Sequence, residues 1–352
     1  MKTYRTTLLT LITIFMLCTF ISCSKKSTTI DEYKYGIIFS SISAKKSIIS
    51  TYSSEGNHLS DNEINMGGLN LASFIRQGIK ENNDIFFACP VIGNTSYNYI
   101  LKLDTTTMES ENIVSEDGIT PTFFSVDNDF AYAGNSSLSE TYLSKTNLNN
   151  NKVELFVKLD GQGILCVNDN INLYVISIVH DESDTKDSSA KLYILNKEDL
   201  SIINEKDIPN ISYISDAKVG NEKLYAMVNR DGSDNLSNTL LEIDLKDLSI
   251  NTIKLPISES MQLHLFDNSL YIVESDFHFN ETKKRIAKLD LSSMDVSVFN
   301  TNNEHLSTII SGNKFVSCDG NDVYIYDIDN FQLLETFPID TPNNMLFISI
   351  YD

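Results

Sequence analysis

Cysteine is scarce in this sequence, and its placement argues against a fold that depends on disulfides. There are five cysteines. Cys18 and Cys23 lie near the N-terminus, whereas Cys89, Cys166 and Cys318 fall in three apolar stretches far apart along the chain. Thiols placed in this way are expected to be small, buried and unpaired groups.

Basic side chains are also few, which limits the partners that the protein can attract. Lysine and arginine number 27 against 48 aspartates and glutamates, so the formal net charge is −21. Loss of residues 1–22 removes Lys2 and Arg5 and no acidic residue, which brings the charge to −23. A surface of this sign repels nucleic acid phosphates and anionic lipid. We therefore expect no nucleic acid partner.

Motifs of nucleophilic and phosphate chemistry are missing. The chain has no Gly-x-Ser-x-Gly elbow and no glycine-rich phosphate loop. No two histidines have the spacing of metal ligands on one helix or strand; they are His58, His180, His264, His278 and His305. The sequence therefore predicts no cofactor.

The N-terminal segment has the three parts of a secretory signal. Lys2 and Arg5 give a basic start, residues 8–21 are apolar apart from short hydroxyl residues, and residues 24–27 are polar. The apolar run of about 14 residues makes a helix of about 21 Å, too short for a hydrocarbon core about 30 Å thick. Residues 1–22 are therefore predicted to be a signal peptide and not a membrane anchor.

The segment Phe20-Ile21-Ser22-Cys23 resembles the bacterial lipobox, in which a small residue precedes a cysteine that is lipidated and becomes the mature N-terminus. Phe20 stands where leucine is usual. The resemblance implies lipidation at Cys23, a tether over residues 23–34 and a membrane-anchored protein on the extracytoplasmic side, at the cell surface or facing a periplasm. Two acyl chains would hold it there stably, because one chain is marginal. The alternative is an ordinary signal peptide with an incidental cysteine.

A unit of about 40 to 50 residues recurs from Tyr35 to the C-terminus, and a period of this size indicates a β-propeller. Each full copy has four short β-rich runs separated by turn residues. Six copies are complete and span 73–113, 122–159, 164–208, 211–255, 261–299 and 307–337. Residues 35–66 supply three further strands, and residues 345–350 supply one.

These two remainders complete a seventh blade if the last strand pairs with the first blade and so removes an exposed edge. We therefore predict an all-β, seven-bladed propeller formed as a single domain by residues 35–352. Six or eight blades are the alternatives if the weak copy at 122–159 is misread. The pattern resembles seven-bladed propellers of the WD40-like, YVTN-type and quinoprotein-like group, although tryptophan and the Trp-Asp dipeptide are absent.

The links between strands differ in length on the two faces of the ring. First-to-second links at 127–128, 220–221, 267–268 and 312–313 are tight, and so are third-to-fourth links such as 246–247. Both sets fall on one face, named here the short-turn face. Second-to-third links are expected to be longer, over 93–97, 134–140, 180–190, 229–238 and 275–284. They emerge on the opposite, long-loop face, where we expect binding.

Acidic residues gather in the predicted long loops. The candidate binding face comprises Asp181, Asp184, Asp187, Asp231, Asp234, Asp276 and His278. A negative arc of this kind suits a cationic peptide, an amine or a metal, and residues 181–184 or 231–234 supply part of a calcium loop without the spacing of an EF-hand. The alternative is a set of solvated loops that only increase solubility.

The sequence thus favours a monomeric binding or scaffolding module whose partner is an envelope protein, a peptide or a glycan. An alternative is a metal-assisted lyase or hydrolase that uses His180, His264 or His278. Some seven-bladed propellers are lyases of cyclic antibiotics, and a resemblance to them would assign a role to His278 and Asp276. A purely structural envelope protein is a third possibility. His264, in an inner strand, is expected to line the channel or to be a hydrogen-bonded structural residue.

Overall fold

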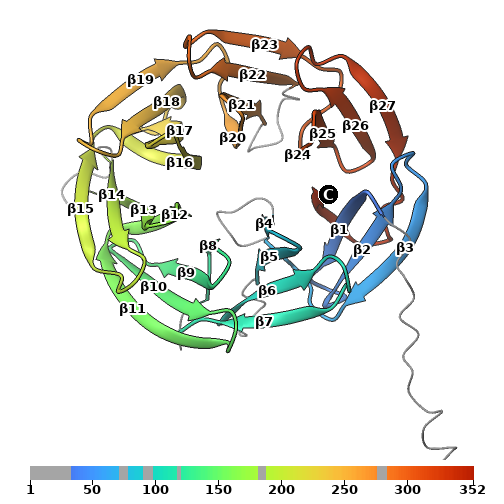
Figure 1. Ribbon diagram of the computed structural model, residues 1–352, viewed down its shortest axis with the longest axis horizontal. Helices are drawn as coiled ribbons and strands as arrows, with labels where there is room; N and C mark the ends of the chain where they lie inside the picture. The colour runs from blue at the N-terminus through green and yellow to red at the C-terminus, as the bar shows by residue number, and fades with distance from the viewer. Residues whose placement is uncertain (1–32, 71–77, 90–97, 117–119, 181–187, 276–283) are drawn as a thin grey trace, which may run out of the picture. The chain divides into compact units, whose positions relative to one another are not determined.

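Seven four-stranded antiparallel sheets are arranged as blades around a central axis (Figure 1). The computed structural model describes residues 33–70, 78–89, 98–116, 120–180, 188–275 and 284–352. Residues from Tyr33 to Asp352 belong to one compact unit. The protein is therefore a seven-bladed β-propeller, and the alternatives of six or eight blades are excluded.

The blades are numbered in chain order, and their strands are given from the axis outward. Blade one has β28 (Leu346–Tyr351), β1 (Tyr35–Ser41), β2 (Lys46–Tyr52) and β3 (His58–Ile64). Blade two has β4 (Ile79–Glu81), β5 (Asp84–Ala88), β6 (Tyr99–Asp104) and β7 (Ser110–Val114). Blade three has β8 (Phe123–Val126), β9 (Phe130–Ser136), β10 (Glu140–Asn147) and β11 (Lys152–Asp160).

Blade four has β12 (Gln162–Asn168), β13 (Asn172–Val179), β14 (Ser189–Asn196) and β15 (Ile202–Ile208). Blade five has β16 (Ile211–Gly220), β17 (Lys223–Asp231), β18 (Leu236–Asp244) and β19 (Ile250–Lys254). Blade six has β20 (Ser260–Phe266), β21 (Ser269–Glu274), β22 (Arg285–Asp290) and β23 (Val296–Asn300). Blade seven has β24 (Ser307–Ser311), β25 (Lys314–Cys318), β26 (Asp322–Asp327) and β27 (Leu333–Pro338).

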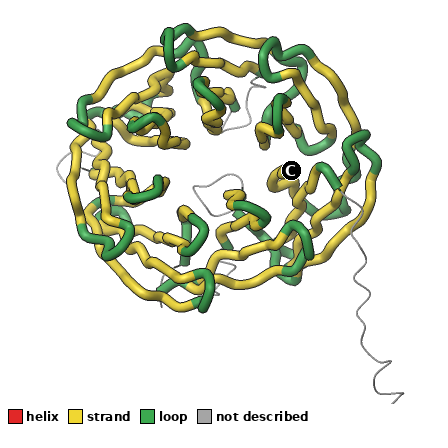
Figure 2. The backbone as a smooth tube through the Cα atoms, in the orientation of Figure 1, coloured by secondary structure: helices red, strands yellow, loops and turns green. Residues whose placement is uncertain are grey.

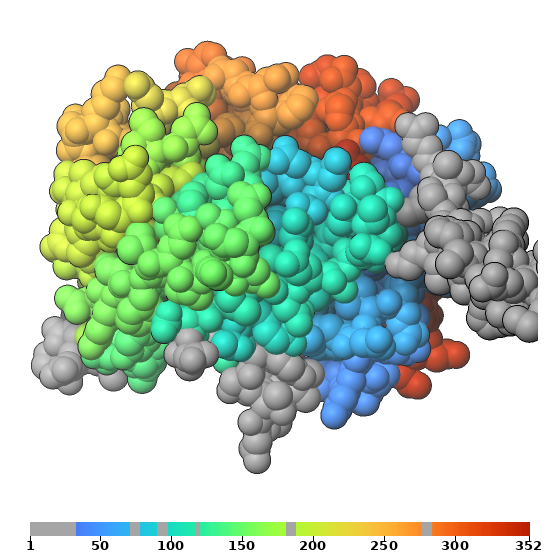
Figure 3. All heavy atoms as spheres, turned by 60° about the horizontal axis from the view of Figure 1, so that its bottom comes forward, coloured from blue at the N-terminus to red at the C-terminus, as the bar shows by residue number. Residues whose placement is uncertain are grey.

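The described part of the chain is made of strands and loops, without a helix (Figure 2). Accordingly, none of its segments is a helix capable of crossing a membrane. Blades that are consecutive in the sequence lie next to one another around the ring (Figure 3).

The ring closes through the strand predicted to do so. β28 occupies the innermost position of blade one and pairs antiparallel with β1, with Ile350 opposite Ile37. The pairing supplies β1 with a hydrogen-bonded neighbour on its inner side, so that the edge of β1 is covered. The weak copy at 122–159 forms blade three with all four strands.

The core lies between blades. On β17, Leu224 and Val228 pack with residues of blade four, whereas Tyr225 and Met227 pack with residues of blade six. Because both faces of a middle strand are covered, it forms a continuous apolar run, whereas outermost strands such as β3 and β15 expose many of their side chains. Tyrosine and phenylalanine supply the largest buried side chains in this tryptophan-free chain.

Blades two to seven share one turn between the third and fourth strands. Each turn begins with an aspartate or asparagine whose Oδ1 accepts a hydrogen bond from the N–H two residues on; they are Asp104, Asn147, Asn196, Asp244, Asp290 and Asp327. The residue four positions later has a φ between 53° and 64°; these residues are Met108, Asn151, Leu200, Leu248, Met294 and Phe331. The side-chain bond and the left-handed residue together close the hairpin.

The same turn touches the link between the first and second strands. In blade five, Leu245 N donates to Glu222 O at 3.0 Å, and equivalent bonds join Lys197 to Ile171 and Leu148 to Asp129. The two sets of short links therefore lie on one face, as predicted, and the second-to-third links lie on the other.

Two of the predicted long loops are wrong. β9 continues to Ser136 and β17 continues to Asp231, so the links are only residues 137–139 and 232–235. Gly134 lies within a strand because the Phe123 ring packs over it, where a Cβ would come within 2.3 Å of Cζ. Asn229 is buried in β17 and donates to Met261 Sδ at 3.2 Å. Because of these contacts, Gly134 and Asn229 lie in strands although both residue types are typical of loops.

Candidate binding sites

The long-loop face carries the second-to-third links together with the segments that lead from one blade to the next. At blades four and five these elements touch: Ile211 N donates to Ser188 O at 3.1 Å, and Ser188 N donates to Gly232 O at 3.4 Å. The link 209–210 between the blades is therefore held beside the hairpin loop of blade five.

Two members of the predicted acidic face lie in the described part of the chain, Asp231 and Asp234. Asp181, Asp184, Asp187, Asp276 and His278 lie outside the described residues, as does the predicted lipidation site Cys23.

Asp231 is the last residue of β17 and organises its own hairpin loop. Its Oδ1 accepts hydrogen bonds from the backbone N–H groups of Asn235 and Ser233, both at 3.0 Å. The bond from Asn235 N, followed by those from its amide side chain and from Ser233 N, lowers the pKa of the Asp231 carboxyl. The carboxylate is thus ionised and held in one orientation at the edge of the face.

Asp234 has a more exposed carboxylate, with three quarters of the side chain accessible. Arg230 Nη1 lies 3.7 Å from Asp234 Oδ2 and donates to Asp234 O at 2.9 Å. On the same face in blade six, Glu274 at the end of β21 is fully buried, and Arg285 binds its two carboxylate oxygens at 2.6 and 2.5 Å. Arginine therefore compensates part of the acidic charge on this face.

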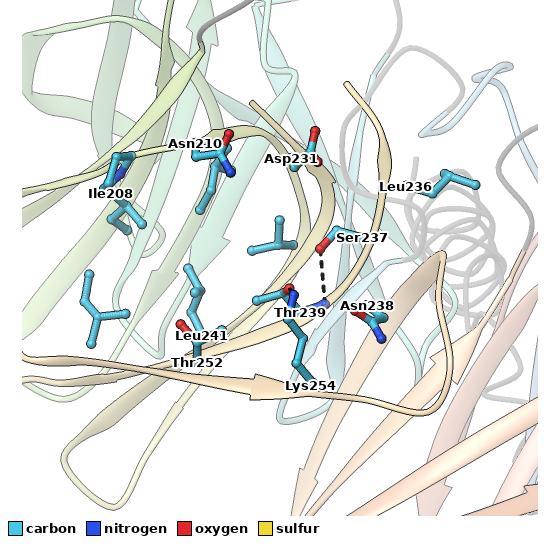
Figure 4. Close-up of a pocket in the computed structure, with 14 residues that line it drawn as sticks. Ile208, Asn210, Asp231, Leu236, Ser237, Asn238, Thr239, Leu241, Thr252 and Lys254 are labelled. Atoms are coloured by element: carbon cyan, nitrogen blue, oxygen red, sulfur yellow. Dashed lines mark hydrogen bonds between the residues drawn. The ribbon is translucent and has the colours of Figure 1, made fainter. Parts of the chain in front are cut away.

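A groove of about 490 Å³ opens between blades four and five on the long-loop face (Figure 4). Ile208, Leu241 and Ile250 give it an aliphatic floor, while Asp231 and Lys254 approach it from β17 and β19. The polar lining also includes Asn210, Ser237, Asn238, Thr239 and Thr252. Leu236 lies at this groove with 52% of its surface exposed. We name this feature the blade 4/5 groove.

A second cavity, of about 380 Å³, lies on the axis and is lined by the innermost strand of every blade. Its apolar lining includes Ile79, Leu165 and Val167 from blades two and four and Ile309 from blade seven, and Lys80 of blade two lines it as well. Its polar side is formed by Ser215, Asp216, Lys218, Gln262, His264 and Thr308 from blades five to seven. We name it the central channel. The expectation that His264 lines a channel is confirmed.

The other described histidines are held by hydrogen bonds. His305 is 1% exposed and contacts Ser317 Oγ at 2.7 Å and Thr301 Oγ1 at 2.8 Å. Burial lowers its pKa to about 3. His180 contacts Ser188 Oγ at 3.1 Å, and the exposed His58 contacts Asp61 Oδ1 at 2.9 Å. Within the described ranges, no three histidine, cysteine or acidic residues are grouped to hold a metal ion.

Three cysteines of the propeller are buried and unpaired, as predicted: Cys89, Cys166 and Cys318. Burial raises the pKa of each thiol, to about 12 at Cys89. They are small apolar groups of the core.

Comparison with known proteins finds structures with a similar fold and no similar sequence. No family model and no curated protein sequence matches it. Apo AztD from Citrobacter koseri superposes with a TM-score of 0.55 and 8% identity over 91% of this chain and 98% of AztD. The Pan2 WD40 domain of Neurospora crassa superposes with a TM-score of 0.53 and 11% identity over 84% of this chain and 89% of that domain. The likeness lies in the fold.

Of the residues singled out in the sequence, Asp231 lines the blade 4/5 groove and His264 lines the central channel; sequence reasoning missed the rest of both linings. Gln262 and Thr308 of the central channel are 46 positions apart, and the blade 4/5 groove combines the end of one repeat with the middle of the next. A usable signal was Pro209-Asn210, which breaks the chain between two strand-like runs beside the predicted loop.

Proposed function

We propose that this protein is a lipid-anchored, extracytoplasmic binding module that captures a segment of another envelope protein in the blade 4/5 groove. The observation that carries the proposal is the groove itself: an aliphatic floor bordered by a fixed carboxylate, on the face opposite the short turns. Binding surfaces are commonly built on the loops of a rigid scaffold, as this one is.

The lining favours a peptide over a glycan. Leu236, which is 52% exposed, and the half-buried Ile250 offer aliphatic surface that an aliphatic side chain would cover, and each buried CH₂ group contributes about 0.8 kcal/mol. Asp231 and the exposed carboxylate of Asp234 would attract a basic residue that follows in the peptide. We therefore expect an extended segment with one or two aliphatic residues and a neighbouring lysine or arginine.

The anchor supports the same function. With Cys23 lipidated, residues 23–34 would separate the propeller from the membrane by up to about 40 Å when fully extended. A tether of this reach would let the ring meet partners at the membrane surface while its net negative charge keeps it away from anionic lipid.

The test compares two aspartate variants in a crosslinking capture from intact membranes. Leu236→Asp changes a leucine at the groove that is 52% exposed, and Leu334→Asp changes one in β27 of blade seven that is 53% exposed. Because the two sites have equal exposure, both proteins should fold and fractionate alike. Loss of a specific partner with Leu236→Asp alone is the expected result. Equal capture by the two variants would remove the groove as the binding site.

A further inference from the structure

The hydrogen bonds of the central channel fix the proton positions on its polar side. The backbone N–H of Thr308 can only donate, so the atom that it reaches at 2.9 Å is Gln262 Oε1. The other atom of that amide, Nε2, donates to Leu306 O at 3.0 Å. The Thr308 hydroxyl also donates to Gln262 Oε1, at 2.6 Å. Oε1 of Gln262 thereby accepts two hydrogen bonds and Nε2 donates one, which fixes the amide in one orientation.

This arrangement decides the tautomer of His264. Its Nε2 lies 2.7 Å from Thr308 Oγ1, whose only proton is already used toward Gln262. Nε2 must therefore carry the imidazole proton and donate it to Thr308. Burial, with a further contribution from the Lys218 ammonium, lowers the pKa of His264 to about 3, so the ring is neutral. Nδ1 consequently has a lone pair and no hydrogen-bond partner among the described residues.

The charged groups of the channel are compensated. The Lys218 ammonium lies 3.0 and 3.2 Å from the two carboxylate oxygens of Asp216. Lys80 Nζ lies 2.9 Å from Asp352 Oδ1. With these pairs and a neutral imidazole, the described lining has no unpaired charge to attract an ion. It combines apolar side chains such as Ile79 and Val167 with one fixed acceptor on blade six.

We propose that the central channel binds a small uncharged molecule made of an apolar ring or chain and one N–H or O–H group, which donates to Nδ1 of His264. The apolar part lies against Ile79, Leu165 and Val167. The volume of about 380 Å³ falls within the range of about 300 to 1,000 Å³ typical of small-molecule sites. The site is distinct from the blade 4/5 groove and does not require the proposed function.

Indole and 1-methylindole form a matched pair of probes, because they differ in whether the ring nitrogen carries a hydrogen. Their dissociation constants are measured on the whole chain by calorimetry, with ligand-observed NMR as a second readout. One hydrogen bond is worth about 0.5 to 1.5 kcal/mol, so indole should bind about 2- to 10-fold more tightly than 1-methylindole.

Two variants locate the site. His264→Phe removes the Nδ1 acceptor and supplies no other, so the preference for indole should fall to about one. Val167→Trp fills the apolar side and should abolish binding of both probes. Its control is Leu138→Trp, at a side chain that is 70% exposed, which should bind both like the parent protein.

The proposal fails if the parent protein is folded and binds neither probe at millimolar concentration. It also fails if the two probes bind the parent equally, if His264→Phe keeps the preference for indole, or if binding survives Val167→Trp. The first of these outcomes would leave the channel as a packed axis of the ring and no more.

Discussion

Lys80 Nζ lies 2.9 Å from Asp352 Oδ1, and this ion pair joins the innermost strand of blade two to the end of the strand that closes blade one. Lys34, which precedes β1, lies 3.6 Å from the other oxygen of the same carboxylate. The Asp352 side chain, which follows β28, therefore contacts both the residue that precedes β1 and a residue of blade two. The closure of the ring is held by these contacts as well as by the ladder between β28 and β1.

Replacing Asp352 with Asn should weaken the closure. Both lysines are about 40% exposed, so we expect a loss of about 1 kcal/mol in the free energy of unfolding and not the larger cost of a buried pair. Urea denaturation measures the change. Asp329→Asn is the control, because Asp329 is 84% exposed and lies 3.8 Å from Lys288. An equal effect of the two substitutions would show that Asp352 has no special role.

The shared turn of blades two to seven predicts opposite effects of glycine at two equivalent positions. Met294 and Leu248 both have positive φ, at 64° and 57°, but Met294 is 37% exposed and Leu248 only 6%. Met294→Gly relieves left-handed strain of about 1 to 2 kcal/mol and costs about 0.5 to 1 kcal/mol in backbone entropy, so it should stabilise slightly. Leu248→Gly also loses core packing and should destabilise by about 2 kcal/mol or more. Destabilisation of similar size in both, measured by thermal unfolding, would contradict this account of the turn.

Acid should destabilise the propeller through His305. Burial holds the pKa of His305 at about 3, whereas in the unfolded chain it is about 6.5. The unfolded state therefore binds one more proton than the folded state between these values, so stability falls as the pH drops below about 6.5. The loss from this group reaches about 2 kcal/mol at pH 5.

The variant His305→Gln removes the imidazole that takes up this proton when the chain unfolds. It should be less stable than the parent at pH 7, because the hydrogen bonds to Ser317 and Thr301 are disturbed. Its unfolding free energy should nevertheless change about 2 kcal/mol less between pH 7 and pH 5. Parallel pH profiles for parent and variant would mean that His305 does not carry the acid sensitivity.

The lipid anchor has its own test. Cys23→Ala removes the only cysteine at the lipobox-like segment and should release the protein from membranes or leave it unprocessed. Cys18→Ala, in the predicted signal peptide, is the control and should fractionate like the parent. A processed, membrane-held Cys23→Ala protein would refute lipidation at Cys23.

The sequence predicted the blades because their information is local. Period-two apolar runs and the turn residues between them, such as Gly220-Asn221, are adjacent in the chain, and Asn221 has the positive φ that its hairpin needs. The closing strand was predicted because a seven-bladed ring uses both the three strands of residues 35–66 and the single strand of residues 345–350. The loop predicted over 134–140 was wrong at Gly134, because the place of this glycine in β9 depends on the Phe123 ring packed over it.

The binding surfaces were harder to predict because they join distant residues. The hydrogen bond between Gln262 and Thr308 links two repeats, and no sequence pattern near either residue predicts it. The acidic loops were visible in the sequence, but the arginine partners of Glu274 and Asp234 became evident only in the structure. Local patterns specify the scaffold, whereas contacts between repeats determine which polar groups remain available.

The most direct test of the central claim is site-specific photo-crosslinking from the blade 4/5 groove in intact cells. A photoreactive residue at position 236 should yield one discrete crosslinked envelope protein, and the same residue at position 334, of equal exposure in the parent, should yield none. A discrete adduct at 236 alone would establish the groove as the contact surface. The same adducts from both positions, or no adduct from 236 in a folded and anchored protein, would contradict the account.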